Sequence, residues 1–370
     1  MFNLTHLTSV HPRFDTRIFH KMCRSLAKNG YSVSLVVADG KGDEMCEGVK
    51  IIDAGSSKNR FDRVRNAPSR VFAKALALNA DLYHLHDPEL IPIGLKLKRL
   101  GKRVIFDIHE NTGLQIRTKG WIPHGIRTLV SFVYERYERW AFKKFDSLIV
   151  PQMAMQAKYA DLSPTVLIAN FPNLADASIS SISREYSKYN LFYAGGLSSE
   201  RGLFNMLDLI VELRTRNPNY KLTLAGSISK RDLKKVKKHM GWSFTHYQGL
   251  VSKENVYKSY NKNSIGLILF NNVGQYYMAY SLKLFEYMQN GMLVIMPDFG
   301  DWMLFNESYQ AGLNVPVNSS KHIADIIDRL SEEDFDRFRT KSAGLIQNVF
   351  NWESQEKILL STYAELLNAK

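Results

Sequence analysis

Short apolar runs rich in β-branched residues alternate with longer amphipathic stretches along most of this 370-residue chain. Strand-like runs without strict in-and-out alternation are typical of parallel strands covered on both faces, and the stretches between them then form crossover helices. Because a single core stops growing at about 250 to 300 residues, two domains are expected. The pattern predicts an α/β chain with two Rossmann-like, doubly wound domains.

A Ser-rich segment without periodicity interrupts this pattern between residues 170 and 190. Such a segment is typical of an interdomain linker. We therefore predict an N-terminal domain over 1–172, a linker over 173–189 and a C-terminal domain over 190–352, with a final helix over about 353–370 packing back on the first domain. Two such domains predict a cleft at the carboxyl ends of their strands.

The amphipathic stretches predict helices in both halves. In the first half these are 15–29, 68–79, 89–100 and a long helix near 126–143. In the second half they are 202–216, 229–239, 253–263 and 282–290, followed by helices from about 319 to 368. Glycines just beyond the first and third helices, Gly30 and Gly101, are typical of helix C-termini.

The net charge of +13 is uneven along the chain: residues 1–172 carry 26 Lys and Arg against 16 Asp and Glu. A basic surface attracts polyanions, which include nucleic acid, anionic lipid headgroups and phosphorylated substrates. Helix-turn-helix and zinc patterns are lacking, and aromatic residues are not interleaved with a basic run, so nucleic acid is the least favoured of these partners.

The chain holds two cysteines, Cys23 and Cys46, which lie in no CxxC pair and beside no His cluster. A disulfide framework and a structural zinc site are therefore not expected, and a reducing cytoplasm fits best. The N-terminal residues lack the features of a signal peptide, and no apolar run approaches the 18 to 20 residues that span a bilayer. We expect a cytoplasmic protein whose membrane contact is peripheral.

A glycine pair ends the first predicted strand of the second half, in YAGGLSSERG (193–202). Gly195 and Gly196 would let backbone amides approach an anion closely, and Arg201 would add a fixed positive charge beside it. A Gly-Gly strand exit that serves only as a tight turn is the alternative.

A second candidate for phosphate binding is YSLKLFEYMQNGMLVIMPD (280–298), which predicts a loop, a helix and a buried strand. Ser281 is placed to cap the helix, whose N-terminus favours a diphosphate that Lys283 would neutralise. Glu286, one turn further, can accept hydrogen bonds from the hydroxyls of a ribose. The alternative for Glu286 is a solvated or salt-bridged helix residue.

This second segment resembles the signature of family-4 retaining glycosyltransferases of the GT-B fold, Glu-x7-Glu running into a helix and a strand. The likeness extends over nearly the whole chain, including HPRFDTRIFHKMCRSLAKNGYSVSLV, FYAGGLSSERG and AGLNVPV. It implies that Glu286 binds the donor ribose, that Ser281 and Leu282 form the phosphate-binding turn, and that Arg201 faces the donor diphosphate. It also implies that His109, in FDIHE, lies near the donor sugar.

Two positions depart from the family pattern. The first Glu of the signature is replaced by Met278, and the family's first basic residue is replaced by Gly196. In the family that Glu commonly contacts hydroxyls of the transferred sugar. Because Met278 cannot accept such hydrogen bonds, we hypothesise a deoxygenated or acylated donor sugar, or a contact supplied by another residue.

Catalysis by this chemistry needs positive charge where the nucleoside diphosphate departs, which Arg201, Lys283 and the N-terminus of helix 282–290 can supply. No DxD segment lies on a suitable loop, so no metal cofactor is expected. HLHDPE (84–89) offers His, Asp and Glu ligands, but Pro88 and the family likeness favour a cleft rim over a metal site.

The acceptor side is expected in the N-terminal half. Asp15 and Arg17 follow a His-Pro loop and are expected to line the acceptor cleft; helix N-capping by Asp15 is the alternative. Asp87 and Glu110 are further acceptor-side candidates, although no carboxylate is marked by spacing as a glycosyl nucleophile. The alternative for His109 is a histidine that is hydrogen-bonded in a packed strand end.

The stretch 121–145 mixes aromatic residues with five basic ones. This composition suits a lipid headgroup interface. An ordinary core stripe explains its apolar residues equally well, since they recur at helical spacing: Leu129, Phe132, Val133, Tyr137 and Trp140.

Together these features predict a retaining, metal-independent glycosyltransferase. It would use a nucleotide-sugar donor, UDP-linked being favoured, and a polyprenyl-diphosphate-linked saccharide acceptor. Anionic inner-leaflet lipid would contact the basic half of the chain, as in the synthesis of O-antigen, lipopolysaccharide or capsule polysaccharide. The alternatives are a GT-B enzyme that does not transfer, such as a nucleotide-sugar 2-epimerase, a sugar-sensing module and a basic polyanion-binding protein.

Overall fold

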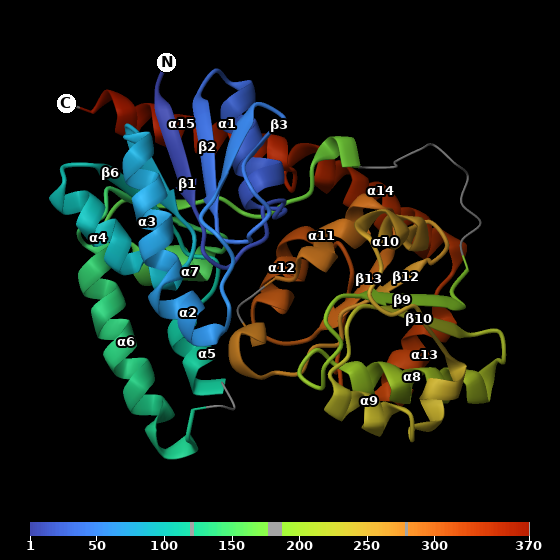
Figure 1. Cartoon of the computed structure of the whole chain (residues 1–370). Coiled ribbons are helices and arrows are strands. Elements are labelled where there is room, and N and C mark those ends of the chain that lie inside the picture. Colours follow the sequence, from blue (N-terminus) through green and yellow to red (C-terminus); the bar gives the residue numbers. More distant parts are fainter. Residues whose placement is uncertain (119–121, 177–186, 278–279, 370) are drawn as a thin grey trace. The chain divides into compact units, whose positions relative to one another are not determined.

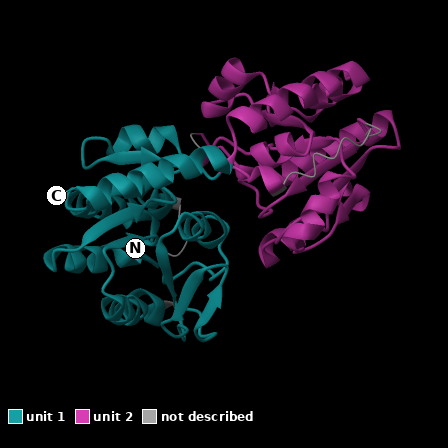
Figure 2. Ribbon diagram, turned by 90° about the horizontal axis from the view of Figure 1, so that it is seen from above, with its two compact units in different colours: residues 1–170, 352–370 teal, residues 171–351 magenta. Residues whose placement is uncertain are grey.

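The computed structural model describes residues 1–118, 122–176, 187–277 and 280–369. The chain divides into two compact units, shown in separate colours in Figure 2. Unit 1 comprises Met1–Asn170 and Trp352–Lys370, and unit 2 comprises Phe171–Asn351. Each unit has its own hydrophobic core and its own sheet.

Unit 1 is built on a sheet with the strand order β3-β4-β2-β1-β5-β6-β7-β8, in which every pair is parallel except β3 with β4. The strands are β1 (Asn3–Leu7), β2 (Ser32–Val37), β3 (Glu44–Cys46), β4 (Val49–Asp53), β5 (Leu82–Leu85), β6 (Arg103–Asp107), β7 (Ser147–Val150) and β8 (Thr165–Leu167). Strands β5 and β7 are buried throughout, although β5 carries His84 and β7 begins with Ser147.

Helices cover both faces of this sheet, as Figure 1 shows. They are η1 (Ile18–Cys23), α1 (Arg24–Lys28), α2 (Arg60–Arg65), α3 (Ala67–Leu78), α4 (Ile91–Arg99), α5 (Thr112–Thr118), α6 (Arg127–Phe142), α7 (Met153–Tyr159) and α15 (Trp352–Asn368). The last of these returns from the end of the chain and packs its buried Trp352, Leu359 and Tyr363 into the core beside β1. Residues far apart in the sequence therefore share one side of the sheet.

Unit 2 has a fully parallel sheet with the order β11-β10-β9-β12-β13-β14. Its strands are β9 (Asn190–Ala194), β10 (Lys221–Ala225), β11 (Thr245–Tyr247), β12 (Ile265–Leu267), β13 (Leu293–Pro297) and β14 (Leu313–Val315). Its α-helices are α8 (Leu203–Arg216), α9 (Lys230–Val236), α10 (Lys253–Tyr260), α11 (Leu282–Gln289), α12 (Asp301–Tyr309), α13 (Ser320–Arg329) and α14 (Glu332–Asn348).

The strand order reverses direction once in each sheet. In unit 1, β1 pairs with β2 on one side and with β5 on the other; in unit 2, β9 lies between β10 and β12. Ligands of open α/β sheets bind beyond the carboxyl ends of the strands at such a reversal. The fold therefore points to the loops that follow β1 and β5 in unit 1, and β9 and β12 in unit 2.

The predicted α/β class with two doubly wound domains is confirmed. Short elements were missed, among them β3, α2, α5, α7 and α12, because three to nine residues hold too little periodicity to separate a strand or a helix from a loop. The predicted helix 15–29 begins at Ile18 instead, with a π-helical stretch. Residues 177–186 of the predicted linker lie outside the described residues.

Candidate functional site

A pocket of about 540 Å³ lies in unit 1 at the carboxyl ends of β1, β5 and β6. It brings together the acceptor-side residues that the sequence predicted, which are Asp15, Arg17, Asp87 and Glu110, and it also takes in His109. Since the loops after parallel strands meet at one sheet edge, residues from positions 15 to 110 converge here. The pocket is thus lined by residues of unit 1 that could bind a polar substrate.

Asp87 is held at the pocket by the loop that follows β1. Its Oδ2 accepts hydrogen bonds from Thr8 Oγ1 at 2.8 Å and from the Ser9 amide at 2.6 Å. Its Oδ1 lies 3.4 Å from His11 Nε2, and His11 Nδ1 lies 3.3 Å from Asp15 Oδ2. His11 thus bridges two carboxylates at the strand-order reversal.

Asp15 also caps the helix that follows it, because its Oδ1 accepts hydrogen bonds from the amides of Arg17 and Ile18. Although burial would raise the pKa of this carboxyl, its hydrogen bonds to His11 and to these amides hold the pKa well below the ordinary value. The capping role and the place on the pocket wall therefore coexist at Asp15.

Arg17 makes a buried ion pair beneath the pocket. Its Nε and Nη2 donate to the two oxygens of Asp107 at 2.8 and 2.7 Å, and its Nη1 donates to the Ile168 carbonyl at 2.8 Å. Burial raises the pKa of Asp107, but the interactions of the carboxylate with Arg17 and His109 together outweigh this effect, so the pKa lies well below the usual range. Asp107 is thus an ionised carboxylate within the fold.

Two histidines share this carboxylate. Asp107 Oδ2 lies 3.2 Å from His86 Nδ1 and 3.0 Å from His109 Nε2. His86 is fully buried, whereas the His109 side chain is partly exposed on the pocket wall. The geometry places His109 between a buried anion and the space in which a substrate would bind.

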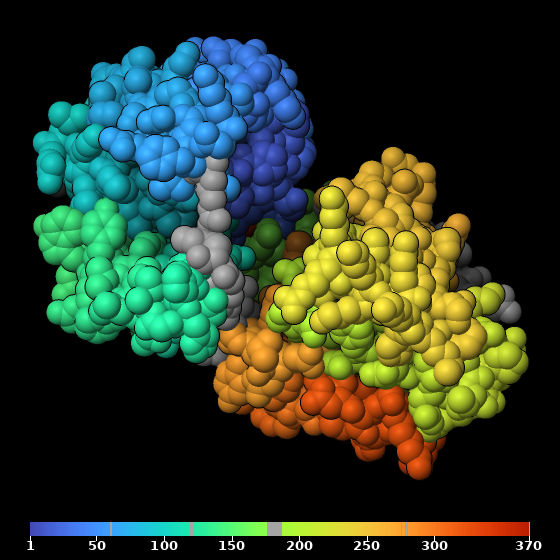
Figure 3. Space-filling view, turned by 60° about the horizontal axis from the view of Figure 1, so that its bottom comes forward, coloured from blue at the N-terminus to red at the C-terminus, as the bar shows by residue number. Residues whose placement is uncertain are grey.

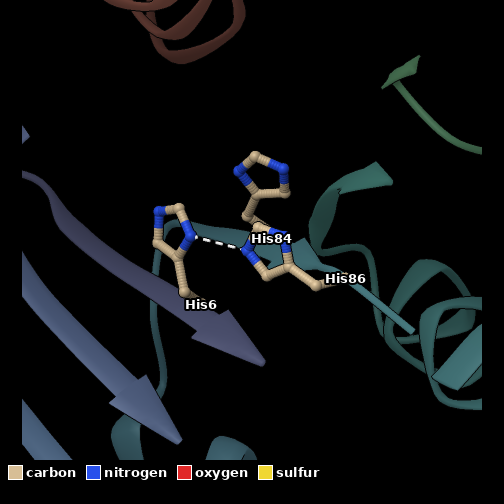
Figure 4. Close-up of side chains that lie close together, drawn as sticks. All are labelled: His6, His84 and His86. Atoms are coloured by element: carbon tan, nitrogen blue, oxygen red, sulfur yellow. Dashed lines mark hydrogen bonds between the residues drawn. The ribbon is translucent and has the colours of Figure 1, made fainter. Parts of the chain in front are cut away.

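Three buried histidines lie behind the pocket on one side of the sheet: His6, His84 and His86 (Figure 4). Burial lowers the pKa of His86 to about 4, and it lowers those of His6 and His84 well below 6.5. All three imidazoles are therefore neutral at pH 7.

We predict that acidification destabilises the fold through these three histidines. Their pKa values are lower in the folded chain than in the unfolded chain, so unfolding takes up protons and stability is lost as the pH falls from about 6.5 towards 4. Each should contribute a slope of about 1.4 kcal/mol per pH unit in the free energy of unfolding. Urea denaturation between pH 7 and pH 4.5 measures this slope.

The pKa of His11 shifts in the opposite direction. Burial lowers it, but the hydrogen bond to Asp15 and the charges of Asp15 and Asp87 raise it overall, so the stability that His11 contributes is lost as the pH rises above 6.5.

The control for the acidification prediction is the exposed His322, whose replacement by Asn should leave the slope of unfolding free energy against pH unchanged, whereas His84→Asn should reduce it. Equal slopes in wild type and His84→Asn would contradict the prediction.

Sequence reasoning did not assign His6, His11, Asp107 or Tyr363 to a site. A signal was present for His84 and His86, since two residues spaced by two in a strand lie on one face, and HLHDPE was noted as a cleft rim. For His6 the missing information was strand register, which places it directly opposite His84. Tyr363 could not be found because it lies more than 250 residues away.

Two groups of side chains in the described residues bring three potential metal ligands together. They are His6 with His84 and His86, and His86 with Asp107 and His109, with ligand atoms within 4.8 Å of one another in each group. Hydrogen bonds account for much of this closeness, since His6 Nδ1 lies 2.9 Å from His86 Nε2 and Arg17 occupies both oxygens of Asp107.

In unit 2 the glycine pair ends β9 as predicted. Gly195 has φ of +150°, a conformation that side-chain-bearing residues rarely adopt, and a Cβ at Gly196 would lie 3.2 Å from Arg201 Nη1. Arg201 is partly buried and its Nε donates to the Tyr276 hydroxyl at 3.1 Å. Gly196 therefore leaves the room that the guanidinium of Arg201 occupies.

The predicted anion seat opens helix α11. Ser281 is its N-cap and accepts a hydrogen bond from the Lys283 amide at 3.3 Å, with Leu282 as the first helical residue. Glu286 Oε2 accepts from Lys283 Nζ and from the Tyr260 hydroxyl, both at 2.6 Å. The ion pair with Glu286 explains Lys283 within the helix, which the sequence had favoured assigning to a ligand. Met278 lies outside the described residues.

Helix α6 presents an apolar stripe to the surface. Leu129, Phe132, Val133 and Trp140 are 49% to 62% exposed, while the helix buries Ser131 and Glu138. The segment forms the green part of the surface of unit 1 in Figure 3. Of the two alternatives open from the sequence, a core stripe is thus wrong for these four residues, and Tyr137 alone of the five packs against the core.

Comparisons with known proteins bear on both units. The model of the family described as Glycosyltransferase Family 4 matches residues 16–175, and that described as Glycosyl transferases group 1 matches residues 177–348. An uncharacterised glycosyltransferase of Bacillus subtilis, YqgM, is 24% identical over 300 residues, which is 77% of each chain.

Solved structures share the fold. Sucrose-phosphate synthase from Thermosynechococcus elongatus superposes with a TM-score of 0.76 at 17% identity, with all of both chains covered. Anabaena HepE in complex with UDP superposes with a TM-score of 0.68 at 13% identity, covering 99% of this chain and 100% of that one. The two family models together span most of the sequence, and the chain therefore belongs to the family-4 glycosyltransferases of the GT-B fold.

Proposed function

We propose that this glycosyltransferase moves a sugar from a nucleotide diphosphate donor, UDP-linked being favoured, to a polyprenyl-diphosphate-linked saccharide. The anomeric configuration of the sugar is retained, no metal takes part, and the product serves O-antigen or capsule synthesis. The observation that carries the donor part is helix α11, where a Ser-capped N-terminus is followed by Lys283 and Glu286.

The donor site is assigned to unit 2. The positive end of the α11 dipole suits the diphosphate, and the buried carboxylate of Glu286 suits the ribose hydroxyls. The complex of HepE with UDP, and that of an Escherichia coli trehalose-6-phosphate enzyme with UDP-2-fluoro glucose, support UDP among the nucleotides. Met278, at the position of the family's first Glu, supports a donor sugar that is deoxygenated or acylated.

Metal independence is proposed from the cations of unit 2. Departure of UDP creates negative charge, which Arg201, Lys283 and the N-terminus of α11 stabilise. Retention follows if the departing phosphate helps to deprotonate the acceptor on the same face of the sugar. Lys283 Nζ donates to Glu286 Oε2 at 2.6 Å, so a bound diphosphate would compete with Glu286 for the ammonium of Lys283.

The acceptor site is assigned to the pocket of unit 1. Asp87 and Asp15 offer carboxylates to sugar hydroxyls, and His109 offers one ring nitrogen beside the buried Asp107. Glu110 is exposed on the pocket rim. These groups recognise hydroxyls, which supports a saccharide as the acceptor.

The proposed contact with membrane lipid rests on helix α6. The exposed stripe of Leu129, Phe132, Val133 and Trp140 runs beside the exposed Arg136 and the exposed Lys143 and Lys144 at its end. An apolar stripe flanked by cations is suited to the interface of an anionic membrane. In the described part of the chain no helix is both long and apolar enough to cross a bilayer.

The proposed function is tested by transfer to an undecaprenyl-diphosphate-linked saccharide, with UDP, GDP and ADP sugars compared. We expect UDP release that requires acceptor, an unchanged rate in excess EDTA and an unchanged anomeric configuration by proton NMR. Thermal shift provides an independent readout, since UDP at 100 times its dissociation constant adds about 2.7 kcal/mol to stability. UDP release without acceptor would favour the epimerase alternative, and loss of activity in EDTA would remove metal independence.

We predict that Phe132→Gln with Val133→Gln weakens binding to vesicles that contain anionic phospholipid by at least tenfold. The two side chains are more than half exposed, so the fold loses little, whereas each would contribute about 1 kcal/mol or more on burial in lipid. Vesicle sedimentation measures the change. Leu304→Gln, an equally exposed apolar residue of unit 2, is the matched control. Equal binding by both variants would exclude α6 as the membrane contact.

A further inference from the structure

A continuous hydrogen-bond chain links the pocket of unit 1 to helix α15. His86 Nδ1 lies 3.2 Å from Asp107 Oδ2, and His86 Nε2 lies 2.9 Å from His6 Nδ1. The chain continues from His6 Nε2 to the Tyr363 hydroxyl at 3.1 Å, and from this hydroxyl to His84 Nδ1 at 2.6 Å. Figure 4 shows the three imidazoles and the bond between His6 and His86.

Asp107 determines which group donates and which accepts in every hydrogen bond of this chain. As an ionised carboxylate it accepts only, so His86 carries its proton on Nδ1 and has a lone pair on Nε2. His6 must then donate from Nδ1, which leaves its Nε2 to accept from the Tyr363 hydroxyl. The Tyr363 oxygen accepts in turn from His84 Nδ1.

The chain ends at His84 Nε2, which is buried and has no hydrogen-bond partner in the described residues. Reversing all the bonds would leave this atom buried without a partner as well, and would also set the lone pair of His86 Nδ1 against the charge of Asp107. The direction that starts at Asp107 is therefore the stable one.

The carboxylate of Asp107 also contacts His109, which lines the pocket. His109 Nε2 lies 3.0 Å from Asp107 Oδ2 and 3.2 Å from His86 Nδ1. Both nitrogens lie within hydrogen-bond distance of one anionic oxygen, whose charge would repel a lone pair on His109 Nε2. We therefore expect a proton on each nitrogen, which would make the 3.2 Å contact between the two rings a close approach of two N–H groups; with the proton of His109 on Nδ1 instead, the same contact would be a hydrogen bond from His86. A neutral His109 then has its lone pair on Nδ1.

We propose that Asp107 is a positioning residue that fixes His109 as the Nε2–H tautomer, so that Nδ1 accepts the hydrogen bond of a substrate hydroxyl. The bidentate bonds from Arg17 fix the orientation of the carboxylate, and the chain through His86, His6 and Tyr363 holds each buried ring in one tautomer, with the proton of His86 directed at Asp107. The inference deepens the proposed function, on which the substrate contact of His109 rests.

Long-range proton–nitrogen NMR of protein labelled with ¹⁵N-histidine tests the tautomers directly, with signals assigned through single His→Gln variants. The expected result at pH 7.5 is Nε2–H for His109 and Nδ1–H for His6, His84 and His86. Finding His109 as Nδ1–H in the wild-type protein would overturn the proposal without any variant.

Asp107→Asn is the corresponding variant, since an amide can either donate to or accept from an imidazole. We expect His109 to become a mixture of tautomers and kcat to fall at least tenfold, with the KM for the donor changed less than threefold. A variant that folds, keeps a pure Nε2–H tautomer and loses activity would show that Asp107 acts in another way.

Tyr363→Phe serves where Asp107→Asn fails to fold, because it cuts the chain and leaves the bonds of Asp107 to Arg17, His86 and His109 in place. We expect His84 to lose its single tautomer while His86 and His109 keep theirs. Loss of the His109 tautomer in this variant would contradict the assignment to Asp107. Tyr220→Phe, which removes a hydroxyl bonded to Asp328 in unit 2, is the control.

The two proposals fail separately. If the tautomers are as expected but His109→Gln retains full kcat, the substrate contact of His109 is wrong and the positioning by Asp107 stands. If His109→Gln abolishes transfer while His109 of the wild-type protein is the Nδ1–H tautomer, the proposed function stands and the positioning by Asp107 is wrong.

Discussion

Replacing Arg17 with Met should lower the free energy of unfolding of unit 1 by about 3 to 5 kcal/mol, the largest effect on stability that we expect from a single substitution. Arg17 is 5% exposed and donates two hydrogen bonds to the fully buried carboxylate of Asp107, one to each oxygen. Without it, a charge stays buried with only imidazole partners. Hydrogen exchange of peptides that cover β1 and β6 measures the loss within unit 1.

Arg139→Met is the matched control in the same unit, because the pair of Arg139 with Asp161 is exposed to solvent and should contribute at most about 1 kcal/mol. A second variant, Arg17→Met with Asp107→Leu, should recover part of the stability, since it removes the uncompensated charge. Equal decreases in the free energy of unfolding for Arg17→Met and Arg139→Met would show that the buried ion pair stabilises the fold no more than the exposed one.

Replacing Glu286 with Gln should lower kcat/KM for the donor by roughly 10- to 100-fold, which is the value of one or two hydrogen bonds to a charged group. The ribose is remote from the bond that breaks, so the interaction is the same in ground and transition states and the loss should fall on KM. Gln keeps the shape of the side chain and an acceptor for the Tyr260 hydroxyl. Initial rates over a range of donor concentrations give kcat and KM separately.

Two control variants separate this role from a structural one. Tyr260→Phe removes a hydrogen bond of Glu286 without altering its charge, and Glu307→Gln changes an exposed carboxylate of α12. Both should leave the KM for the donor within a few-fold of wild type. An unchanged KM in Glu286→Gln would remove the ribose contact from the proposal, leaving Glu286 as the partner of Lys283.

Local pattern was sufficient for the architecture. Buried parallel strands need unbroken apolar runs and their crossovers need amphipathic helices, so the α/β class and the longer helices could be read from residue order. Short-range chemistry was equally readable: Ser281 caps α11, and the glycine pair ends β9 where expected. The segment that resembles the family signature, and the family itself, follow from the same residues.

Partners distant in the sequence were not readable, because a side chain's contacts depend on strand register and on which face of a helix is covered. Residue order alone left Leu129, Phe132 and Trp140 equally suited to core and surface, and the packing of α6 through Ser131 and Glu138 decided it. The pairing of β1 with β5 set His6 opposite His84, and the return of α15 brought Tyr363 to both. Tertiary structure alone joined these groups to Asp107, since hydrogen bonds between buried groups form only when separate elements pack together.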